Sequence, residues 1–585
     1  MRSIFCMAIL ASLLAIAGCA TTPETQQIPG KGPKQDQGSR PSARAAGEEK
    51  AGAGDRAAEW KKIPRERRSQ KVFREYSQPH PVPAPSFRPL AGRPPHPGGA
   101  YSRRQRPRFN TESYDRIYDN AFKNVADAPV STFSVDVDTA SYSIMRRFLH
   151  RGTLPPKDSV RIEELINYFP YAYQAPNGGK HPFSVNVEVA GALWNPERLV
   201  VRIGIKGREI QWKNRALSNL VFLLDVSGSM RSPNKLPLLK RSLKLLVDNL
   251  GENDRVAIVV YAGAAGLVLP PTTGERKEAI LAAIDRLAAG GSTNGGRGIQ
   301  LAYKVARREF ITGGINRVIL ATDGDFNVGT TSRGALVRLI EKEAKSGVFL
   351  TVLGYGMGNY KGSTLERLAG KGNGNYAYID TISEARKVLV EQIGGTMITI
   401  AKDVKIQVEF NPALVTSYRL IGYENRILRR RDFNDDTKDA GDIGAGHTVT
   451  ALYEIVPAGK PKTGGKVDPL KYQQRPGLSK AARSGEMMTV KLRYKQPQGS
   501  KSTLIVLAVK AHPVAFGEAS EDFRFASAVA SFGMLLRDSE HKGNSSYARV
   551  LEVVEQAGGK KDAYRREFAA LARKAAALPV RVEKR

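Results

Sequence analysis

The chain has few of the residues that build cross-linked or catalytic sites. Of its 585 residues, two are cysteines (Cys6 and Cys19) and seven are histidines, none of which forms an H-E-x-x-H pattern. It also has no complete G-x-G-x-x-G loop, no Walker A lysine and no zinc-finger spacing. No histidine is placed as a base for a serine nucleophile. These absences argue against a disulfide framework, a zinc protease and a nucleotide-binding loop.

Apolar runs long enough to cross a membrane are missing as well. The apolar run at residues 4–17 is shorter than the roughly 20 residues that a membrane-spanning helix needs. It follows a basic residue and leads into Ile-Ala-Gly-Cys, which predicts a signal peptide (residues 1–19) ending in a bacterial lipobox. Cys19 would become the lipidated amino terminus. In bacteria with two membranes, an Asp after the lipidated cysteine tends to retain a lipoprotein in the inner membrane. Ala20 at this position therefore favours the outer membrane, with the protein facing the periplasm.

Residues 20–110 have few apolar side chains and are rich in Pro, Gly, Ser, Gln, Arg and Lys. Such a segment buries too little surface to offset its chain entropy, so we expect a disordered basic tether. Positive charge is concentrated at residues 61–68 and 103–108. This charge either is solvated linker charge or binds anionic lipid headgroups near the anchor.

The net charge of +33 predicts attraction to anionic partners. Nucleic acid is the first candidate for so basic a chain. However, the sequence carries no recognisable RNA-binding signature, and the lipobox predicts export from the cytoplasm. We therefore expect no nucleic-acid partner, and a membrane surface or an acidic envelope protein instead.

The most informative stretch is Asn-Leu-Val-Phe-Leu-Leu-Asp-Val-Ser-Gly-Ser-Met at residues 219–230. The apolar run at 220–224 predicts a buried strand, and Asp225, Ser227 and Ser229 follow it directly. In an open α/β sheet, ligands bind just beyond the carboxyl ends of the strands. Oxygen ligands suit a hard divalent cation rather than zinc or copper. The alternative is a polar loop that only caps the next helix.

Two later stretches, at residues 290–296 and 317–324, complete a pattern that begins with D-x-S-x-S at 225–229. In order and spacing, the three loops resemble the metal-ion-dependent adhesion site of von Willebrand factor A (VWA) domains. The resemblance covers residues 217–397, called here the inserted domain. It implies a single Mg²⁺ ion, or alternatively Ca²⁺ or Mn²⁺, to which a protein partner supplies an Asp or Glu. The implied ligands are Asp225, Ser227, Ser229, Thr293 and Asp323.

Within the inserted domain, strand and helix patterns alternate, which predicts an α/β fold. We expect a VWA-type doubly wound, mostly parallel sheet with helices on both faces and its loops gathered on one edge. The expected strands are 220–224, 255–261, 318–321 and 348–353. The expected helices are 239–250, 279–287, 299–310, 336–344 and 384–393.

The segments on either side of the inserted domain show the two-residue alternation of half-buried strands. We expect them to form one β-rich, sandwich-like flanking domain that the VWA domain interrupts; two separate β domains are the competing interpretation. The expected strands are 183–189 and 199–205 before the insertion, and 404–410, 449–456, 489–494 and 504–509 after it.

The remaining segments predict helices at 141–151 and 160–169, and a helical carboxyl-terminal region with helices at 521–537, 545–557 and 563–578. From about residue 114 to 578 the chain resembles a bacterial subfamily of VWA lipoproteins, the YfbK-like proteins. Asp136 and Asp138 invite a second metal hypothesis, although acids that alternate on a strand usually face solvent. The expected domains are 1–19, 20–110, 111–216, 217–397, 398–516 and 517–585.

Two functions fit these features. The first is an envelope-anchored, non-enzymatic lipoprotein that binds a protein partner through the metal site, for adhesion or scaffolding. The second is a metal-dependent hydrolase or a regulatory subunit of an envelope enzyme. Hydrolysis would need a general base besides the metal ligands, and Asp325 is the one obvious extra acid. An acid on a loop beside a metal more often supports a ligand or is solvated, so we expect no enzymatic activity.

Overall fold

The computed structural model describes residues 112–136, 138–211, 215–291, 295–324, 333–357, 362–438, 440–460, 477–558 and 562–579. The chain divides into two units, residues 1–63 and 64–585, and every described residue belongs to the second. The expected signal peptide with Cys19, the expected tether, Thr293 and Asp325 lie outside the described residues.

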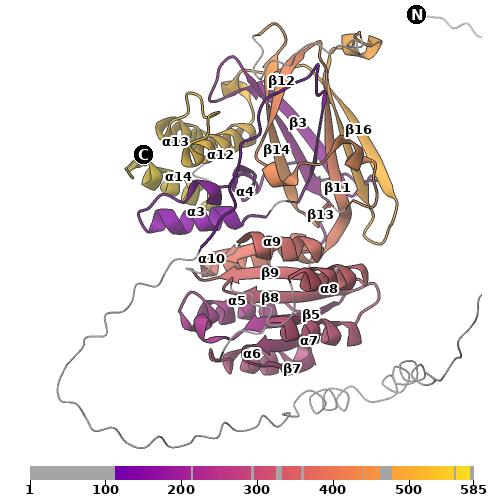
Figure 1. The fold of residues 1–585 in the computed structure, drawn as a ribbon, viewed down its shortest axis with the longest axis vertical. Helices are drawn as coiled ribbons and strands as arrows, with labels where there is room; N and C mark the ends of the chain where they lie inside the picture. The colour runs from indigo at the N-terminus through magenta and orange to yellow at the C-terminus, as the bar shows by residue number, and fades with distance from the viewer. Residues whose placement is uncertain are drawn as a thin grey trace, which may run out of the picture. The chain divides into compact units, whose positions relative to one another are not determined.

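The inserted domain is built on a six-stranded sheet with the order β10-β9-β8-β5-β6-β7 (Figure 1). Its strands are β5 (Ser218–Asp225), β6 (Arg255–Tyr261), β7 (Ala265–Thr273), β8 (Ile315–Thr322), β9 (Phe349–Tyr355) and β10 (Tyr376–Ile379). All neighbours pair in parallel except β7, which is antiparallel to β6. The predicted doubly wound, mostly parallel sheet is thus confirmed.

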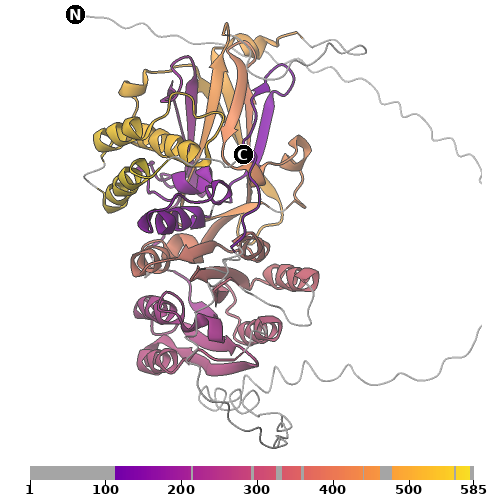
Figure 2. The same ribbon diagram turned by 60° about the vertical axis from the view of Figure 1, so that its left-hand side comes forward.

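Helices cover both faces of this sheet (Figure 2). They are α5 (Leu236–Asp248), α6 (Lys277–Asp285), α7 (Gly295–Arg308), α8 (Arg333–Lys345), α9 (Gly362–Lys371), α10 (Ile382–Arg386) and α11 (Ile393–Met397), with a π-helical turn at Lys387–Glu391. The central strand β5 is buried along its whole length, because helices cover it on both sides. Leu239 and Leu243 of α5 share a core cluster with Phe222 of β5. All buried members of this core belong to the inserted domain.

The flanking domain consists of two sheets packed face to face. The first has the order β1-β12-β14-β4-β3, and the second the order β13-β11-β15-β16 with β2 beside β11. Before the insertion lie β1 (Lys123–Asn124), β2 (Val130–Ser134), β3 (Phe183–Gly191) and β4 (Leu199–Gly207). After it lie β11 (Thr399–Phe410), β12 (Val415–Ile421), β13 (Gly441–Gly444), β14 (Thr448–Pro457), β15 (Glu486–Lys495) and β16 (Ser502–Lys510). Ile203 of the first sheet and Ile406 of the second belong to the shared core, as in a β-sandwich.

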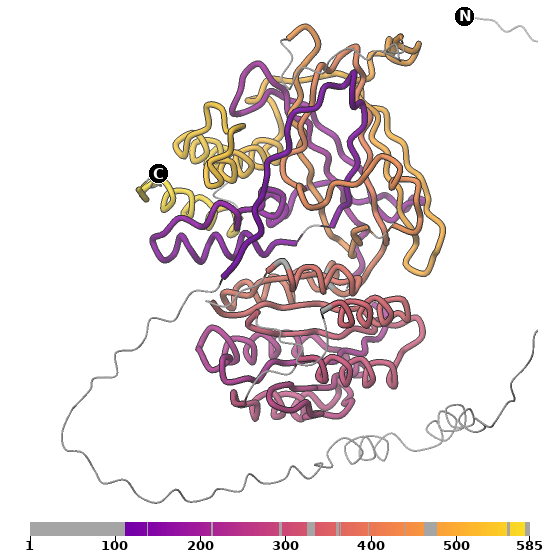
Figure 3. The backbone as a smooth tube through the Cα atoms, viewed as in Figure 1, coloured from indigo at the N-terminus to yellow at the C-terminus, as the bar shows by residue number. Residues whose placement is uncertain are grey.

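Strands from the two sides of the insertion pair with each other. β4 and β14 form an antiparallel ladder from Lys206 opposite Thr448 to Leu199 opposite Ile455. β2, from before the insertion, pairs with β11, from after it. Figure 3 shows the purple and orange segments side by side in this domain. One flanking domain interrupted by the inserted domain is therefore confirmed, and two separate β domains are excluded.

The carboxyl-terminal region is helical, as predicted, with α12 (Glu521–Arg537), α13 (Tyr547–Gln556) and α14 (Ala563–Ala576). These helices share a core cluster with α3 (Ala140–His150), α4 (Ile162–Ile166) and the first sheet: Phe525 and Phe568 belong to it together with Val200. The helix expected over 160–169 was too long, since only Ile162–Ile166 is α-helical. Within the described ranges, no helix combines the length and the apolar character that crossing a membrane requires.

Candidate metal site at the carboxyl edge of the inserted sheet

Asp225 is the last residue of β5, and its carboxylate is completely buried. Its Oδ1 accepts a hydrogen bond from the backbone N–H of Ser227 at 2.9 Å. Its Oδ2 accepts hydrogen bonds at 3.3 Å from the hydroxyls of Tyr261, at the end of β6, and Thr322, at the end of β8. Since β6 and β8 are the two neighbours of β5, the sheet itself orients this carboxylate.

The two serines of the first loop lie next to each other, with their Oγ atoms 3.0 Å apart. Ser227 has an extended backbone conformation and precedes a 3-10 turn, Gly228–Arg231, that contains Ser229. This turn brings two hydroxyl oxygens together on the side of the loop where the strand ends. The loop therefore contributes one carboxylate and two neutral oxygens in close proximity.

Backbone hydrogen bonds fasten the first loop to the second. Gly228 N donates to the carbonyl of Gly291 at 3.0 Å, and Gly290 N donates to the carbonyl of Val226 at 2.7 Å. The second loop thus runs beside the first up to Gly291. Thr293, the ligand expected from this loop, lies outside the described residues.

Asp323, the acid of the third loop, follows β8 directly and is also buried. Its Oδ2 accepts a hydrogen bond from Lys235 Nζ at 2.7 Å. Burial raises the pKa of Asp225 to about 6, hydrogen bonds from Ser227 counteract the rise, and the negative charge of Asp323 adds to it. Two carboxylates that repel each other in a buried site favour a cation between or beside them.

The donor set fits a hard divalent ion. Two carboxylates and two hydroxyls on adjacent loops supply only oxygen, as Mg²⁺ and Ca²⁺ prefer. In the described part of the chain no group of three or more His, Cys, Asp or Glu residues forms a metal cluster. A site with two acids and hydroxyl oxygens is not of that kind. The carboxylate and hydroxyl oxygens at this edge are suited to binding a cation beside the loops.

Three residues at this edge were missed from the sequence: Tyr261, Thr322 and Lys235. Tyr261 and Thr322 are polar residues at the carboxyl ends of strands that flank β5, and that position was a usable signal. Lys235 lies just before α5, and nothing in its local sequence indicates an acidic partner.

The expectation that Asp136 and Asp138 face solvent from a strand is wrong. β2 ends at Ser134, so both acids follow it in a loop. Asp138 is buried and accepts a hydrogen bond from the backbone N–H of Tyr376 in β10 at 3.0 Å. Asp136 forms an ion pair with Arg426 at 2.8 Å. Asp138 and Tyr376 thus connect the flanking domain with the inserted domain, whereas Asp136 and Arg426 both belong to the flanking domain.

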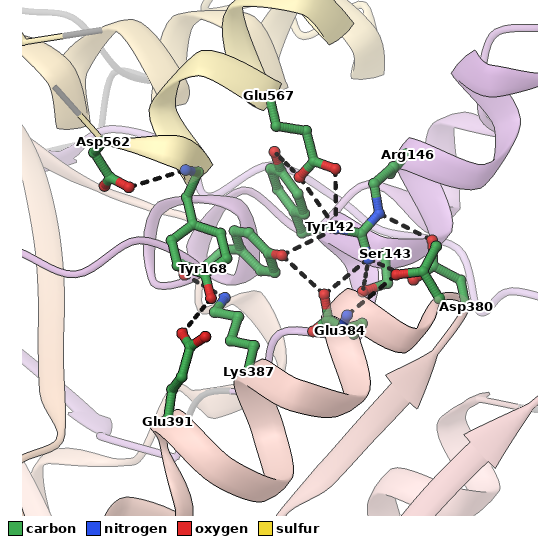
Figure 4. Close-up of polar contacts among 12 residues, drawn as sticks. Tyr142, Ser143, Arg146, Tyr168, Asp380, Glu384, Lys387, Glu391, Asp562 and Glu567 are labelled. Atoms are coloured by element: carbon green, nitrogen blue, oxygen red, sulfur yellow. Dashed lines mark hydrogen bonds and ion pairs between the residues drawn. The ribbon is translucent and has the colours of Figure 1, made fainter. Parts of the chain in front are cut away.

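A second set of buried charges connects the two domains at α10 (Figure 4). Arg146 of α3 forms ion pairs with Asp380 and with Glu384, the latter at 2.8 Å. The hydroxyl of Tyr168 also donates to Glu384, at 2.8 Å. Lys387 Nζ donates to the carbonyl oxygen of Tyr168 at 2.6 Å. These polar contacts hold the last helices of the inserted domain against α3 and against Tyr168, which follows α4.

Family models match almost all of the described chain. Residues 219–392 match the von Willebrand factor type A domain, and residues 108–202 match a model described as von Willebrand factor. Fold and matches together define a VWA-domain protein. Domains of this class are typically non-enzymatic and often bind a metal ion at a metal-ion-dependent adhesion site.

The remaining match, at residues 395–578, is to the carboxyl-terminal domain of the uncharacterized protein YfbK. The chain is 46% identical over 465 residues to YfbK of Escherichia coli (strain K12), covering 78% of this chain and 80% of that protein. The chain therefore belongs to the YfbK family of VWA proteins, which confirms the resemblance found in the sequence.

More distant relatives match a smaller part of the chain or have a lower sequence identity to it. The E3 ubiquitin-protein ligase WAV3 of Arabidopsis thaliana is 24% identical over 218 residues, which are 36% of this chain and 27% of that protein. Among solved structures, a von Willebrand factor type A protein from Catenulispora acidiphila is 16% identical, with a TM-score of 0.37. That match covers 71% of this chain and 99% of the other.

Proposed function

We propose that this protein is a non-enzymatic VWA lipoprotein of the bacterial envelope that binds a protein partner through a divalent cation. The observation that carries the proposal is the arrangement at the carboxyl edge of one sheet. Two buried carboxylates, Asp225 and Asp323, lie there together with two adjacent serine hydroxyls. The residues that would hold the ion are Asp225, Ser227, Ser229, Thr293 and Asp323. Mg²⁺ is the proposed ion, with Ca²⁺ and Mn²⁺ as alternatives.

The roles of these residues follow from their charges. Asp225 and Asp323 supply two negative charges, which balance a divalent ion, and the hydroxyls add neutral oxygens. When bound, the ion would supply a positive centre that accepts an oxygen from another protein. An Asp or Glu of the partner is the strongest ligand of that type, because its bond to the site is charge-assisted. Adhesion or scaffolding is the function that such a contact supports.

The proposed cellular location rests on the sequence of the amino terminus. Cys19 would carry the lipid anchor in the outer membrane, with the folded part facing the periplasm. Residues 20–110 would act as a tether whose basic segments are attracted to anionic lipid headgroups. We also propose that the protein has no nucleic-acid partner.

Metal binding by the mature chain without its anchor cysteine, residues 20–585, tests the site. Asp225→Ala removes one charge and one ligand while the rest of β5 stays intact, so we expect calorimetry with Mg²⁺ to show no binding. The matched control is Asp285→Ala, since Asp285 lies in the same domain but is 57% exposed and pairs with Lys244. This control is expected to bind Mg²⁺ like the wild type. Far-UV circular dichroism checks that both variants fold.

Partner capture tests the function. Crosslinking in the native envelope, followed by mass spectrometry, is expected to recover a partner from wild-type cells. Recovery should fall when EDTA is present or when Asp225 is replaced by Ala. Capture that survives both treatments would show that the metal edge is not the binding surface. A turnover screen with Mg²⁺ addresses the hydrolase alternative, and we expect no substrate to be consumed.

A further inference from the structure

Lys235 provides a cation at the proposed metal site. Its Nζ lies 2.7 Å from Asp323 Oδ2, and the side chains of Lys235 and Asp323 are 11% and 1% exposed. A hydrogen bond of this length between an ammonium and a carboxylate is charge-assisted and strong when it is shielded from water. Lys235 is therefore a defined contact of one of the two acids that the proposed function assigns to the metal.

The stem of Lys235 is held in place by the backbone after β9. Gly356 has a φ of +79°, and a Cβ atom on this residue would lie 2.3 Å from Lys235 Cε and 2.6 Å from Cγ. Such distances leave no room for any side chain at position 356. The lysine stem occupies that space, so it packs directly against the backbone of Gly356 while its ammonium contacts Asp323.

The formal charges at the site show what this lysine does. Asp225 and Asp323 together carry two negative charges and Lys235 one positive charge, so a divalent ion would leave the site with one positive charge in excess. A carboxylate from a partner would bring the total to zero. Without the lysine, the ion and the two acids would already be neutral, and a partner carboxylate would be in excess.

We propose that Lys235 is a resident counter-cation that weakens the binding of a divalent ion alone and strengthens the binding of ion and acidic ligand together. The proposal rests on the proposed function of the same site. Lys235 competes with the ion for Asp323, and the excess positive charge of the ion-bound site is balanced only when an acidic group joins the ion. The partner is therefore an acidic peptide segment, and the lysine makes metal binding depend on it.

Calorimetric titration of the mature chain with Mg²⁺ at neutral pH tests the first part. Lys235→Met keeps an apolar stem beside Gly356 and removes the charge, so we expect Mg²⁺ to bind at least about tenfold more tightly. Lys235→Gln serves as a second neutral variant if the methionine variant does not fold. The matched control is Lys240→Met, because Lys240 lies on α5, which begins directly after Lys235, and donates to the carbonyl oxygens of Asp285 and Leu287 rather than to an acid of the site. Its Mg²⁺ affinity should equal that of the wild type.

The second part is tested by repeating the titration in the presence of a short acidic probe, an acetylated and amidated Gly-Asp-Gly peptide. We expect the probe to tighten Mg²⁺ binding more in the wild type than in Lys235→Met. Equal Mg²⁺ affinities of the wild type and both neutral variants would overturn the role of Lys235 and leave the metal site intact. Binding by the neutral variants alone would support the role in its strongest form. If neither the wild type nor the variants bind, the proposed metal site fails together with this inference.

Discussion

Arg146 of α3 and Glu384 of α10 form a buried ion pair of 2.8 Å between the flanking domain and the inserted VWA domain. The guanidinium also binds Asp380, at the carboxyl end of β10, and reaches Glu567 of α14 at 3.1 Å. One side chain thus connects three segments that are far apart in the sequence (Figure 4). Apart from Glu567, which is one-third exposed, these groups are nearly inaccessible to water, so charge holds this part of the interface together.

Replacing Arg146 by Ala is expected to destabilise the protein strongly. The substitution leaves Asp380 and Glu384 buried without their cation, which typically costs about 3–5 kcal/mol. The measurement is the free energy of unfolding in urea, followed by circular dichroism. Arg549→Ala is the matched control, since Arg549 and its partner Glu552 are both half exposed on α13, and a change below about 0.5 kcal/mol is expected there. Similar losses in the two variants would contradict the assigned role of Arg146.

Lys387 makes a second, pH-dependent contribution at the same interface. Burial lowers the pKa of its ammonium from the ordinary 10.5 to about 7, while the negative charge of Glu384 opposes the shift. Between these two values the unfolded chain binds a proton that the folded chain does not, so this group's contribution to stability rises as the pH rises from about 7 to 10.5. Below about 7 both states are protonated, and the penalty is constant.

Lys387→Met removes this titration. The variant's gain in stability relative to the wild type should be largest at pH 7 and shrink by roughly 1.4 kcal/mol per pH unit on the way to pH 10.5. The lost hydrogen bond to the carbonyl of Tyr168 adds an offset that does not vary with pH. Urea titrations of both proteins at pH 7, 8.5 and 10 measure the difference. A difference that stays constant over this range would show that Lys387 does not titrate there.

Cys19→Ala tests the proposed cellular location. Without the thiol no acyl chain can be attached, and each buried CH₂ of such a chain contributes about 0.8 kcal/mol to membrane binding. We expect unprocessed precursor or soluble protein in cell fractionation, checked by mass spectrometry of the amino terminus. Cys6→Ala is the control, because Cys6 would be removed with the signal peptide, and it should behave like the wild type. Normal processing and membrane partitioning of Cys19→Ala would refute the lipobox interpretation.

Much of the fold could be read from local patterns. The apolar run at 220–224 marks the buried strand β5, and α12 has the bounds 521–537 that its periodicity predicts. Other elements were missed for physical reasons. β7 contains Pro270 and Pro271, which argue against a strand in the sequence but are tolerated because β7 is at the edge of its sheet. β10 is only four residues long, too short for its pattern to stand out.

The residues of the candidate site were also predictable from the sequence only in part. The positions of Asp225, Ser227, Ser229 and Asp323 follow from strands that end in polar loops, a pattern that is local in the sequence. The contact of Lys235 with Asp323 has no such pattern, since it joins the start of α5 to the end of β8. The sequence points to oxygen ligands, whereas only the structure reveals a cation already held by one of them.

By itself, the sequence determined most of the order of strands and helices, the three loops of the proposed metal site and the strong positive charge. Those features depend on residues close together in the chain, where side-chain periodicity and turn chemistry are enough. The tertiary structure decided that Lys206 lies opposite Thr448, that Arg146 meets Glu384 and that Asp138 is buried. Periodicity assigns a residue to a face but does not choose its partner. That choice depends on how distant segments pack into one core, where register and burial are settled together.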